Sequence, residues 1–203
     1  MAIQLQQSDS TAIDGAIAAC STLTLGSGPV ALQATQGGAA GSNSNTITVA
    51  GNASQVAYVF FETAANEPGL TSWQSGTYTM RLNLTAGNAL QLTWDALYIC
   101  RVSSSGVSQA TIASATLMNI AMSLGVHSKS LTGSAQTASV GDRLYFVLGF
   151  STNSGLALNF SFKADQLIDT PLVASSATFI SQPLKIGSGQ ILKSGGPNKL
   201  RLS

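Results

Sequence analysis

The chain has 203 residues, of which only 8% are charged, and its nine Lys and Arg against eight Asp and Glu give a net charge of +1. This balance excludes a general attraction to nucleic acid or to an acidic membrane surface, and no apolar run reaches the roughly 18 residues that a membrane span requires. An ordinary soluble domain is about a quarter charged. A polar but nearly uncharged surface suits a protein that packs against copies of itself or against another protein.

The first 43 residues are rich in Gln, Ser, Ala, Gly and Thr and contain few large apolar side chains. We interpret residues 1–43 as an extended N-terminal arm with a short strand near residues 2–6. Plain terminal disorder explains the same composition equally well.

From residue 45 onward, apolar and polar residues alternate with a period of two, which predicts strands separated by turns. The segments at 77–85 and 90–102 are joined by the turn residues Ala86, Gly87 and Asn88, and are predicted to form a hairpin. The predicted strands lie at 46–50, 55–62, 77–85, 90–102, 143–151 and 157–163.

Residues 107–124 are harder to interpret, because their Ala and Met content tolerates a helix whereas their Ser, Thr and Asn content opposes one. We expect a loop that leads into a strand at about 117–124, followed by a short strand around Leu131. Beyond Pro171 the alternation is lost. Only short strands within 179–191 are expected there, followed by a tail.

About seven to nine strands and no helix are therefore expected between residues 45 and 165. This pattern predicts an all-β fold, an antiparallel β-sandwich with a jelly-roll-like connection. The expected organisation is an arm at 1–43, a sandwich domain at 44–170 and a C-terminal tail or short strands at 171–203. The predicted core contains Phe60, Leu82, Trp94, Tyr98, Phe146, Phe160 and Phe162.

The sequence contains no catalytic signature. GxSxG, HExxH and phosphate-loop motifs are absent, and the single histidine, His127, stands alone in a loop-like stretch. We therefore predict no catalytic residues, no cofactor and no enzymatic activity. The two cysteines, Cys20 and Cys100, show no metal-binding spacing. They either pair in an oxidising compartment or stay free and buried, and the apolar strand around Cys100 favours a free thiol.

Charged residues near strand ends are the remaining candidates for chemistry. Glycoside hydrolysis needs two facing carboxylates, and Glu62, Asp95 and Asp142 are the possible acids, although Asp142 is more simply a turn residue after a glycine. Arg81 and Arg101 lie on the outward faces of the predicted hairpin. They are expected to be solvated, to share an acid such as Asp95, or to bridge subunits.

Exposed aromatic side chains would favour carbohydrate binding. Trp73, which lies beside Gln74 and Ser75 in a predicted loop, is the candidate sugar platform, and packing beneath the sheet edge is the alternative. Three further aromatic residues, Tyr78, Trp94 and Tyr98, fall on apolar stripes and are therefore expected in the core.

The C-terminal segment is basic, because Asp169 is the last acid in the chain. The basic residues that follow it are Lys185, Lys193, Lys199 and Arg201. A solvated tail, a contact with nucleic acid and docking on an acidic protein surface are all compatible with this pattern.

One stretch resembles known proteins. Residues 73–163 contain the segments WQSGTYTMRLN (73–83), LTW (92–94), LYICRV (97–102), VGDRLYFV (140–147) and FSF (160–162). They resemble a loose group of uncharacterised proteins from tailed bacteriophage genomes and prophages. The resemblance covers about 90 residues and implies a structural protein of the virion, of the capsid decoration (cement) or surface-fibre type. It implies no active-site residues.

Composition and resemblance together suggest a capsid decoration protein on the virion surface. Such a protein would stabilise the shell by bridging neighbouring copies of the major capsid protein, because a ligand that binds only the assembled state stabilises that state. We expect a homo-trimer that contacts the shell through its arm and through Lys185, Lys193, Lys199 and Arg201. The alternative is a surface or tail module that recognises host polysaccharide.

Overall fold

The computed structural model divides the chain into two compact units, Met1–Val173 and Ala174–Ser203. The residues that the structure describes are 2–7, 30–34, 45–49, 51, 57–63, 70–87, 91–103, 108–139, 141–163, 168–173, 184–186, 190–194 and 200–202. In this part of the chain there is no α-helix, and hence no helix long and apolar enough to cross a membrane.

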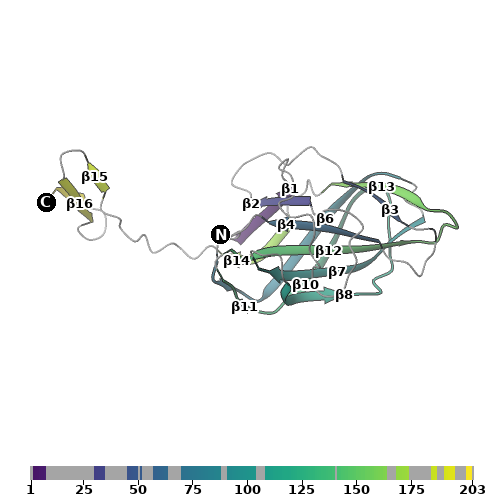
Figure 1. Ribbon diagram of the computed structural model, residues 1–203, viewed down its shortest axis with the longest axis horizontal. Coiled ribbons are helices and arrows are strands. Elements are labelled where there is room, and N and C mark those ends of the chain that lie inside the picture. Colours follow the sequence, from purple (N-terminus) through teal and green to yellow (C-terminus); the bar gives the residue numbers. More distant parts are fainter. Residues whose placement is uncertain are drawn as a thin grey trace. The chain divides into compact units, whose positions relative to one another are not determined.

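The first unit consists of strands and turns (Figure 1). Its strands are β1 (Ala2–Gln7), β2 (Val30–Ala34), β3 (Asn45–Val49), β4 (Ala57–Thr63), β5 (Ser72–Trp73), β6 (Gly76–Ala86), β7 (Leu92–Val102), β8 (Ser108–Ala115), β9 (Ile120–Ala121), β10 (Gly125–Gly133), β11 (Gln136–Thr137), β12 (Arg143–Thr152), β13 (Leu158–Lys163) and β14 (Ile168–Val173).

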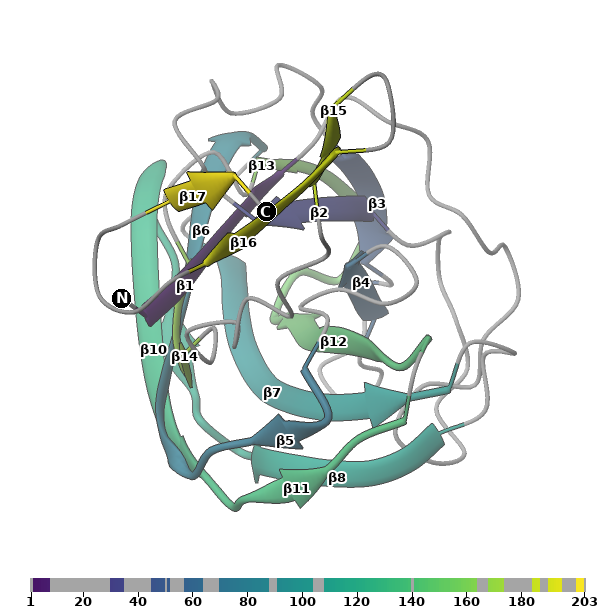
Figure 2. The same cartoon turned by 90° about the vertical axis from the view of Figure 1, so that its left-hand side faces the viewer.

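Twelve of these strands form one continuous sheet in the order β3-β13-β6-β14-β1-β2-β4-β12-β7-β8, with β10 paired to β6 and β9 paired to β7. The described pairings in this sheet are antiparallel, except that β2 runs parallel to β4. The sheet curves around a central core, which Figure 2 shows with β6 and β10 on one side and β7 and β8 on another. We call β13, β6, β14 and β1 the first wall, and β4, β12, β7 and β8 the second wall.

The predicted all-β antiparallel fold is confirmed. Strand β6 alternates as its sequence predicts: its apolar residues face the core, where they are less than 2% exposed, and its polar residues are half-buried or exposed. The core-facing residues are Tyr78, Met80, Leu82 and Leu84. Period-two alternation is the mark of a strand with one buried face, and it fixes this register.

The predicted hairpin of β6 and β7 is wrong. Strand β6 pairs with β10, β13 and β14, whereas β7 pairs with β12, β8 and β9. Strands β6 and β7 therefore belong to different walls and do not form a hairpin. Strand β12 is buried along its whole length, so it needs a partner on each edge and takes β4 and β7.

Strand β7 contains a bulge that the alternation of its residues does not predict. Gly149 of β12 is opposite Ala96, but the next residue, Phe150, is opposite Trp94, so Asp95 has no partner in β12. An extra residue exchanges the two faces of the strand beyond it. Leu97 and Ile99 consequently join the main core.

The bulge also corrects one core assignment. Tyr98 is only half-buried and lies outside the main core, so the prediction of a core position for it is wrong. The other predicted core residues with described side chains are fully buried: Leu82, Trp94, Phe146, Phe160 and Phe162. The side chain of Phe60 lies outside the described residues.

The region 107–124 also differs from expectation. Its main strand is β8 (Ser108–Ala115), earlier than the predicted strand at 117–124, and only the two-residue β9 follows. Leu117 and Asn119 have φ angles of 54° and 50°, which no strand residue adopts. Strand β10 was expected as a short element around Leu131 but extends over Gly125–Gly133.

The N-terminal segment contributes to the sheet. Strand β1 lies between β14 and β2, and Leu5 is fully buried, whereas an arm was expected over residues 1–43. The remainder of this segment, outside β1 and β2, is not among the described residues.

The C-terminal unit contains its own antiparallel sheet of β15 (Leu184–Ile186), β16 (Gln190–Ser194) and β17 (Leu200–Leu202). Lys185 lies in β15, and Lys193 of β16 is the register partner of Arg201 in β17. Lys199 lies outside the described residues. The sandwich domain was expected to end at residue 170. The first unit ends at Val173, because β14 continues to that residue.

Candidate functional site

The second wall is packed on both faces. Its inner face contributes to the main core, and its outer face carries a second apolar cluster in which Cys100, Val102, Tyr145 and Val147 are buried. A strand that is covered on both faces of its sheet has a nearly continuous apolar sequence. Strand β12 has such a sequence and is buried along its whole length. A pocket adjoins this cluster on the outer face.

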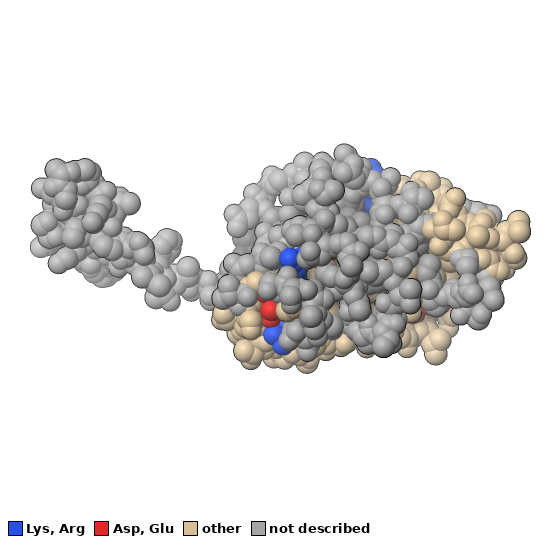
Figure 3. Space-filling model, viewed as in Figure 1, with Lys and Arg blue, Asp and Glu red and all other residues tan. Residues whose placement is uncertain are grey.

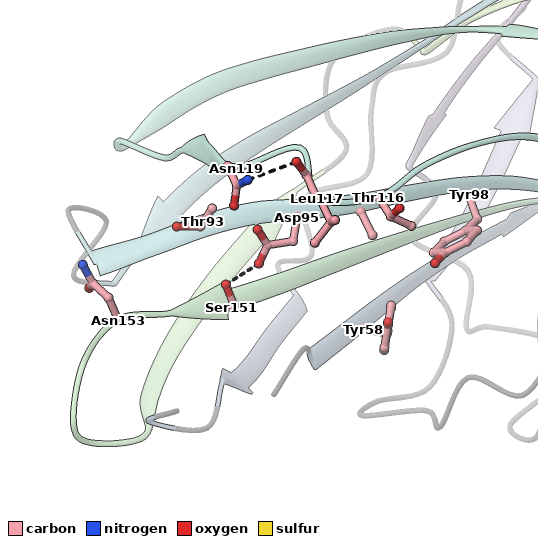
Figure 4. Close-up of a pocket in the computed structure, with 10 residues that line it drawn as sticks. Tyr58, Thr93, Asp95, Tyr98, Thr116, Leu117, Asn119, Ser151 and Asn153 are labelled. Atoms are coloured by element: carbon pink, nitrogen blue, oxygen red, sulfur yellow. Dashed lines mark hydrogen bonds between the residues drawn. The ribbon is translucent and has the colours of Figure 1, made fainter. Parts of the chain in front are cut away.

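The pocket has a volume of about 540 Å³, within the range of roughly 300–1,000 Å³ that is usual for small-ligand sites. It is lined by Tyr58, Thr93, Asp95, Ala96, Tyr98, Thr116, Leu117, Asn119, Ser151 and Asn153. Figure 4 shows Tyr58 and Tyr98 at one end, Thr93 and Asn153 at the other, and Asp95 and Ser151 between them. The site thus combines two aromatic rings with a row of polar groups.

The bulge in β7 places Asp95 in this pocket. Because Asp95 is the extra residue of the bulge, its side chain is free of the ladder and lies beside β12, where Ser151 Oγ donates a hydrogen bond to Asp95 Oδ2. The carbonyl oxygen of Asp95 accepts a hydrogen bond of 3.0 Å from the Met118 backbone N–H. Ser151 therefore fixes the Asp95 carboxylate, and the Asp95 backbone fixes the neighbouring loop.

That loop, residues 116–119, forms one rim of the pocket. Leu117 and Asn119 are the two non-glycine residues with positive φ in the described part of the chain, and Asn119 Nδ2 donates to the Leu117 carbonyl oxygen at 3.1 Å. Leu117 is also 82% exposed, so no packing compensates its backbone strain. Strain of this kind is common at functional sites.

The two tyrosines stand close to the carboxylate. Burial raises the pKa of the Tyr58 phenol above its ordinary value of 10.0, and electrostatic interactions with the neighbouring Tyr98 and Asp95 raise it further. Tyr58 therefore stays protonated across the physiological range and presents a hydroxyl that both donates and accepts hydrogen bonds.

Asp95 is the one charged residue among the pocket's lining residues. The other acids described in the first unit are all paired: Asp169 with Arg81 at 2.7 Å, Asp142 with Arg101 at 2.7 Å and Glu62 with Arg143 at 3.4 Å. No such ion pair involves Asp95 in the described residues. Few charged side chains of described residues are visible on the face shown in Figure 3. Within the pocket, this single carboxylate is the main electrostatic feature.

Trp73, the predicted sugar platform, is not available to a ligand. Trp73 is 1% exposed, and its Nε1 donates to the Leu70 carbonyl oxygen at 3.0 Å. The small β5–β11 ribbon packs it against the main core, so the alternative of packing beneath the sheet edge holds. Tyr78 and Trp94 are buried as predicted, whereas Tyr98, assigned to the core, lines the pocket.

The predicted charge interactions also need correction. Arg81 and Arg101 do not share Asp95: Arg81 forms an ion pair with Asp169, and Arg101 forms one with Asp142. Asp142 is a turn residue as expected: its backbone N–H donates to the Ser139 carbonyl oxygen at 3.1 Å, and its carboxylate accepts from the Ser139 backbone N–H at 2.8 Å.

Three further residues singled out in the sequence lie outside the pocket. Glu62 is fully buried and accepts a hydrogen bond from Tyr145. His127 lies in β10, with Nε2 2.8 Å from the Ser123 carbonyl oxygen. Cys100 is disulfide-bonded, so the prediction of a free thiol is wrong. Cys20, the only other cysteine in the chain, lies outside the described residues.

Among the described residues no three His, Cys, Asp or Glu side chains gather as metal ligands would. A pocket with one carboxylate, two phenols, amides and hydroxyls is suited to binding a neutral or cationic polar ligand by hydrogen bonds and ring contacts.

No protein-family model matches the chain, and no curated protein does. Among solved structures, the chain is similar to two crystal structures of a CocE/NonD family hydrolase from Staphylococcus aureus, each at 8% sequence identity. One similarity has a TM-score of 0.42 and covers 65% of this chain and 33% of the hydrolase chain. The other has a TM-score of 0.49 and covers 85% and 36%. The chain spans about a third of the hydrolase's length, and similarity this distant carries no inference about activity.

Proposed function

We propose that this chain is a glycan-binding module and that its ligand occupies the pocket on the second wall. The observation that carries the proposal is the placement of Tyr58 and Tyr98 beside the Asp95–Ser151 pair in one cavity (Figure 4). A sugar ring presents an apolar C–H face and a belt of hydroxyls. Tyrosine rings pack against the apolar C–H face, and carboxylate, amide and hydroxyl groups form hydrogen bonds with the sugar hydroxyls.

We propose that the pocket binds a glycan and does not hydrolyse it. Glycoside hydrolysis uses two carboxyl groups about 5–10 Å apart, and Asp95 is the single acid among the lining residues. Its partner in the pocket is a serine hydroxyl rather than a second acid.

The resemblance of residues 73–163 to tailed-bacteriophage proteins supports a setting on the virion surface. In that setting the ligand would be a polysaccharide of the host cell. This corresponds to the alternative function that the sequence suggested, and the pocket supports it more directly than it supports capsid decoration.

Capsid decoration remains a second proposal. The low fraction of charged residues and a separate C-terminal unit that contains Lys185, Lys193 and Arg201 support docking on the major capsid protein, with trimerisation as a further proposal. Immunolabelling of purified virions distinguishes the two: label distributed over the shell favours decoration, and label confined to the tail favours glycan recognition.

Binding itself is tested with the full chain on a panel of bacterial surface polysaccharides, followed by titration of the strongest ligand. We expect Tyr98→Ala to raise Kd at least about tenfold, which corresponds to roughly 1.4 kcal/mol. Thr132→Ala is the matched control and should leave Kd unchanged, because Thr132 is exposed on β10, which pairs with β6 of the first wall, and does not line the pocket. Equal affinities of wild type and Tyr98→Ala would contradict the proposal.

A further inference from the structure

The electrostatics of the pocket restrict the kind of glycan that it accepts. Among the described residues that line it there is one carboxylate, Asp95, and no Lys, Arg or His. An anionic sugar such as a uronic acid would place a second negative charge in this cavity with no positive charge to compensate it, and like charges in a partly desolvated site repel.

The carboxylate is also available to a ligand. Asp95 is half-buried, and one of its oxygens, Oδ2, accepts the Ser151 hydroxyl hydrogen. The other oxygen, Oδ1, accepts no hydrogen bond from the described residues. The Ser151 contact fixes the orientation of the carboxylate while leaving this oxygen for a donor that enters the pocket.

The surrounding groups favour a positively charged donor. Tyr58 and Tyr98 lie at the same site, and the face of an aromatic ring attracts an ammonium group within about 6 Å. A hydrogen bond from an ammonium group to a carboxylate is roughly twice as strong as one between neutral partners. A protonated amine on a sugar ring would use the carboxylate and the rings together.

We propose that the pocket selects amino sugars with a free, protonated amine, whose ammonium group donates to Asp95 Oδ1 while the sugar ring lies against Tyr58 and Tyr98. This inference rests on the proposed glycan-binding function and adds the chemical class of the ligand. The feature that distinguishes this class from acetylated, neutral and acidic sugars is its positive charge.

The test compares three oligosaccharides of equal length: one of glucosamine, one of N-acetylglucosamine and one of glucose. Each is titrated calorimetrically against the full chain at pH 6 and low salt. We expect the glucosamine oligomer to bind at least about tenfold more tightly than the other two. The ratio should fall as salt is added, because exposed charges are screened over roughly 10 Å at 0.1 M ionic strength.

Asp95→Asn is the decisive variant, because it removes the charge and keeps an oxygen that can accept from Ser151. We expect the ratio of the glucosamine and N-acetylglucosamine affinities to fall to about one in Asp95→Asn and to be unchanged in Thr132→Ala. Matching thermal unfolding midpoints would show that both variants are folded.

Three outcomes would overturn the inference. If all three oligosaccharides bind equally and Tyr98→Ala weakens each of them, glycan binding stands and only the amine preference is wrong. If none binds and no polysaccharide of the wider panel binds either, the proposed function fails as well. If Ca²⁺ alone binds the wild type but not Asp95→Asn, Asp95 is a metal ligand rather than an ammonium acceptor.

Discussion

The outer faces of the two walls differ in how they are packed and in which side chains they carry. On the first wall, β6 turns apolar residues inward and leaves Thr79, Arg81 and Asn83 half-buried on the outside. On the second wall, β7 and β12 are packed on both faces, β7 carries a bulge, and a pocket adjoins the outer cluster. Both walls contribute to the core, and the irregular second wall also holds the groups that can bind a ligand.

Two carboxylates differ in a similar way. On the first wall, the half-buried carboxylate of Asp169 is paired with Arg81 at 2.7 Å. On the second wall, Glu62 and Asp142 are also paired with arginines, whereas Asp95 accepts a hydrogen bond from the neutral Ser151 hydroxyl and forms no ion pair with a described residue. Asp95 is thus fixed in the pocket by a hydrogen bond and has no cationic partner among the described residues.

The largest expected effect concerns the core that both walls share. Phe150 of β12 stacks on Phe162 of β13, with ring centroids 4.7 Å apart, and this contact joins the second wall to the first. Because Phe150 is fully buried, Phe150→Ala should lower the free energy of unfolding by about 3–5 kcal/mol. Urea denaturation measures the loss.

Leu156→Ala is the control for that substitution, since Leu156 lies between the same two strands and is 74% exposed. It should change stability by less than about 0.5 kcal/mol. A loss below about 1 kcal/mol for Phe150→Ala would mean that the walls do not depend on this stack.

The contrast between the walls also explains what the sequence predicts and what it misses. The alternation in β6 was sufficient to assign Tyr78, Met80, Leu82 and Leu84 to the core, because successive side chains of a strand point to opposite faces of the sheet. The pairing partners of β6 could not be assigned in this way, because the turn at residues 86–88 permits both a hairpin and a crossing between walls.

The pocket was harder to predict for a related reason. A single extra residue, Asp95, exchanges the faces of β7 beyond it, so Tyr98 moves from the expected core position to the pocket. No residue type marks a bulge of this kind, since the residues on both sides are equally apolar. Asp95 itself was a signal, because an acidic side chain in the middle of a long apolar strand is seldom buried without a partner or a role.

A smaller effect tests the rim of the pocket. Leu117 has a φ of 54°, a conformation that costs a non-glycine residue roughly 1–2 kcal/mol and costs glycine almost nothing. Leu117→Gly should therefore raise the free energy of unfolding by about 1 kcal/mol, measured by urea denaturation. It removes little packing, because the side chain is 82% exposed.

Leu156→Gly is the matched control for this substitution. Leu156 is similarly exposed but is not among the residues with positive φ. Glycine there should destabilise by about 0.4–1 kcal/mol, because it adds conformational freedom to the unfolded chain. Destabilisation of similar size in both variants would show that the pocket rim stores no strain.

The smallest effect belongs to the outer face of the first wall. Asp169 Oδ1 accepts from Gln4 Nε2 of β1 at 2.8 Å, and its Oδ2 lies 2.7 Å from Arg81 of β6. Burial acts to raise the pKa of Asp169, but the hydrogen bonds from Gln4 and Arg81 and the positive charge of Arg81 outweigh it and hold the pKa below its ordinary value. The carboxylate thus ties the N-terminal strand to the centre of the first wall.

A carboxyl group whose pKa is lower in the folded state stabilises the fold above its ordinary pKa of about 3.9, and this contribution is lost as the pH falls through the lowered value. Because the side chains of Arg81 and Asp169 are 32% and 38% exposed, solvent screening limits the contribution to less than about 1 kcal/mol. Asp169→Asn should therefore cost less than about 1 kcal/mol in urea denaturation at pH 7, and the difference from wild type should narrow as the pH falls below about 4. A difference that persists unchanged in acid would mean that Asp169 acts through the shape of its hydrogen bonds and not through its charge, and the electrostatic contrast between Asp169 and Asp95 would no longer hold.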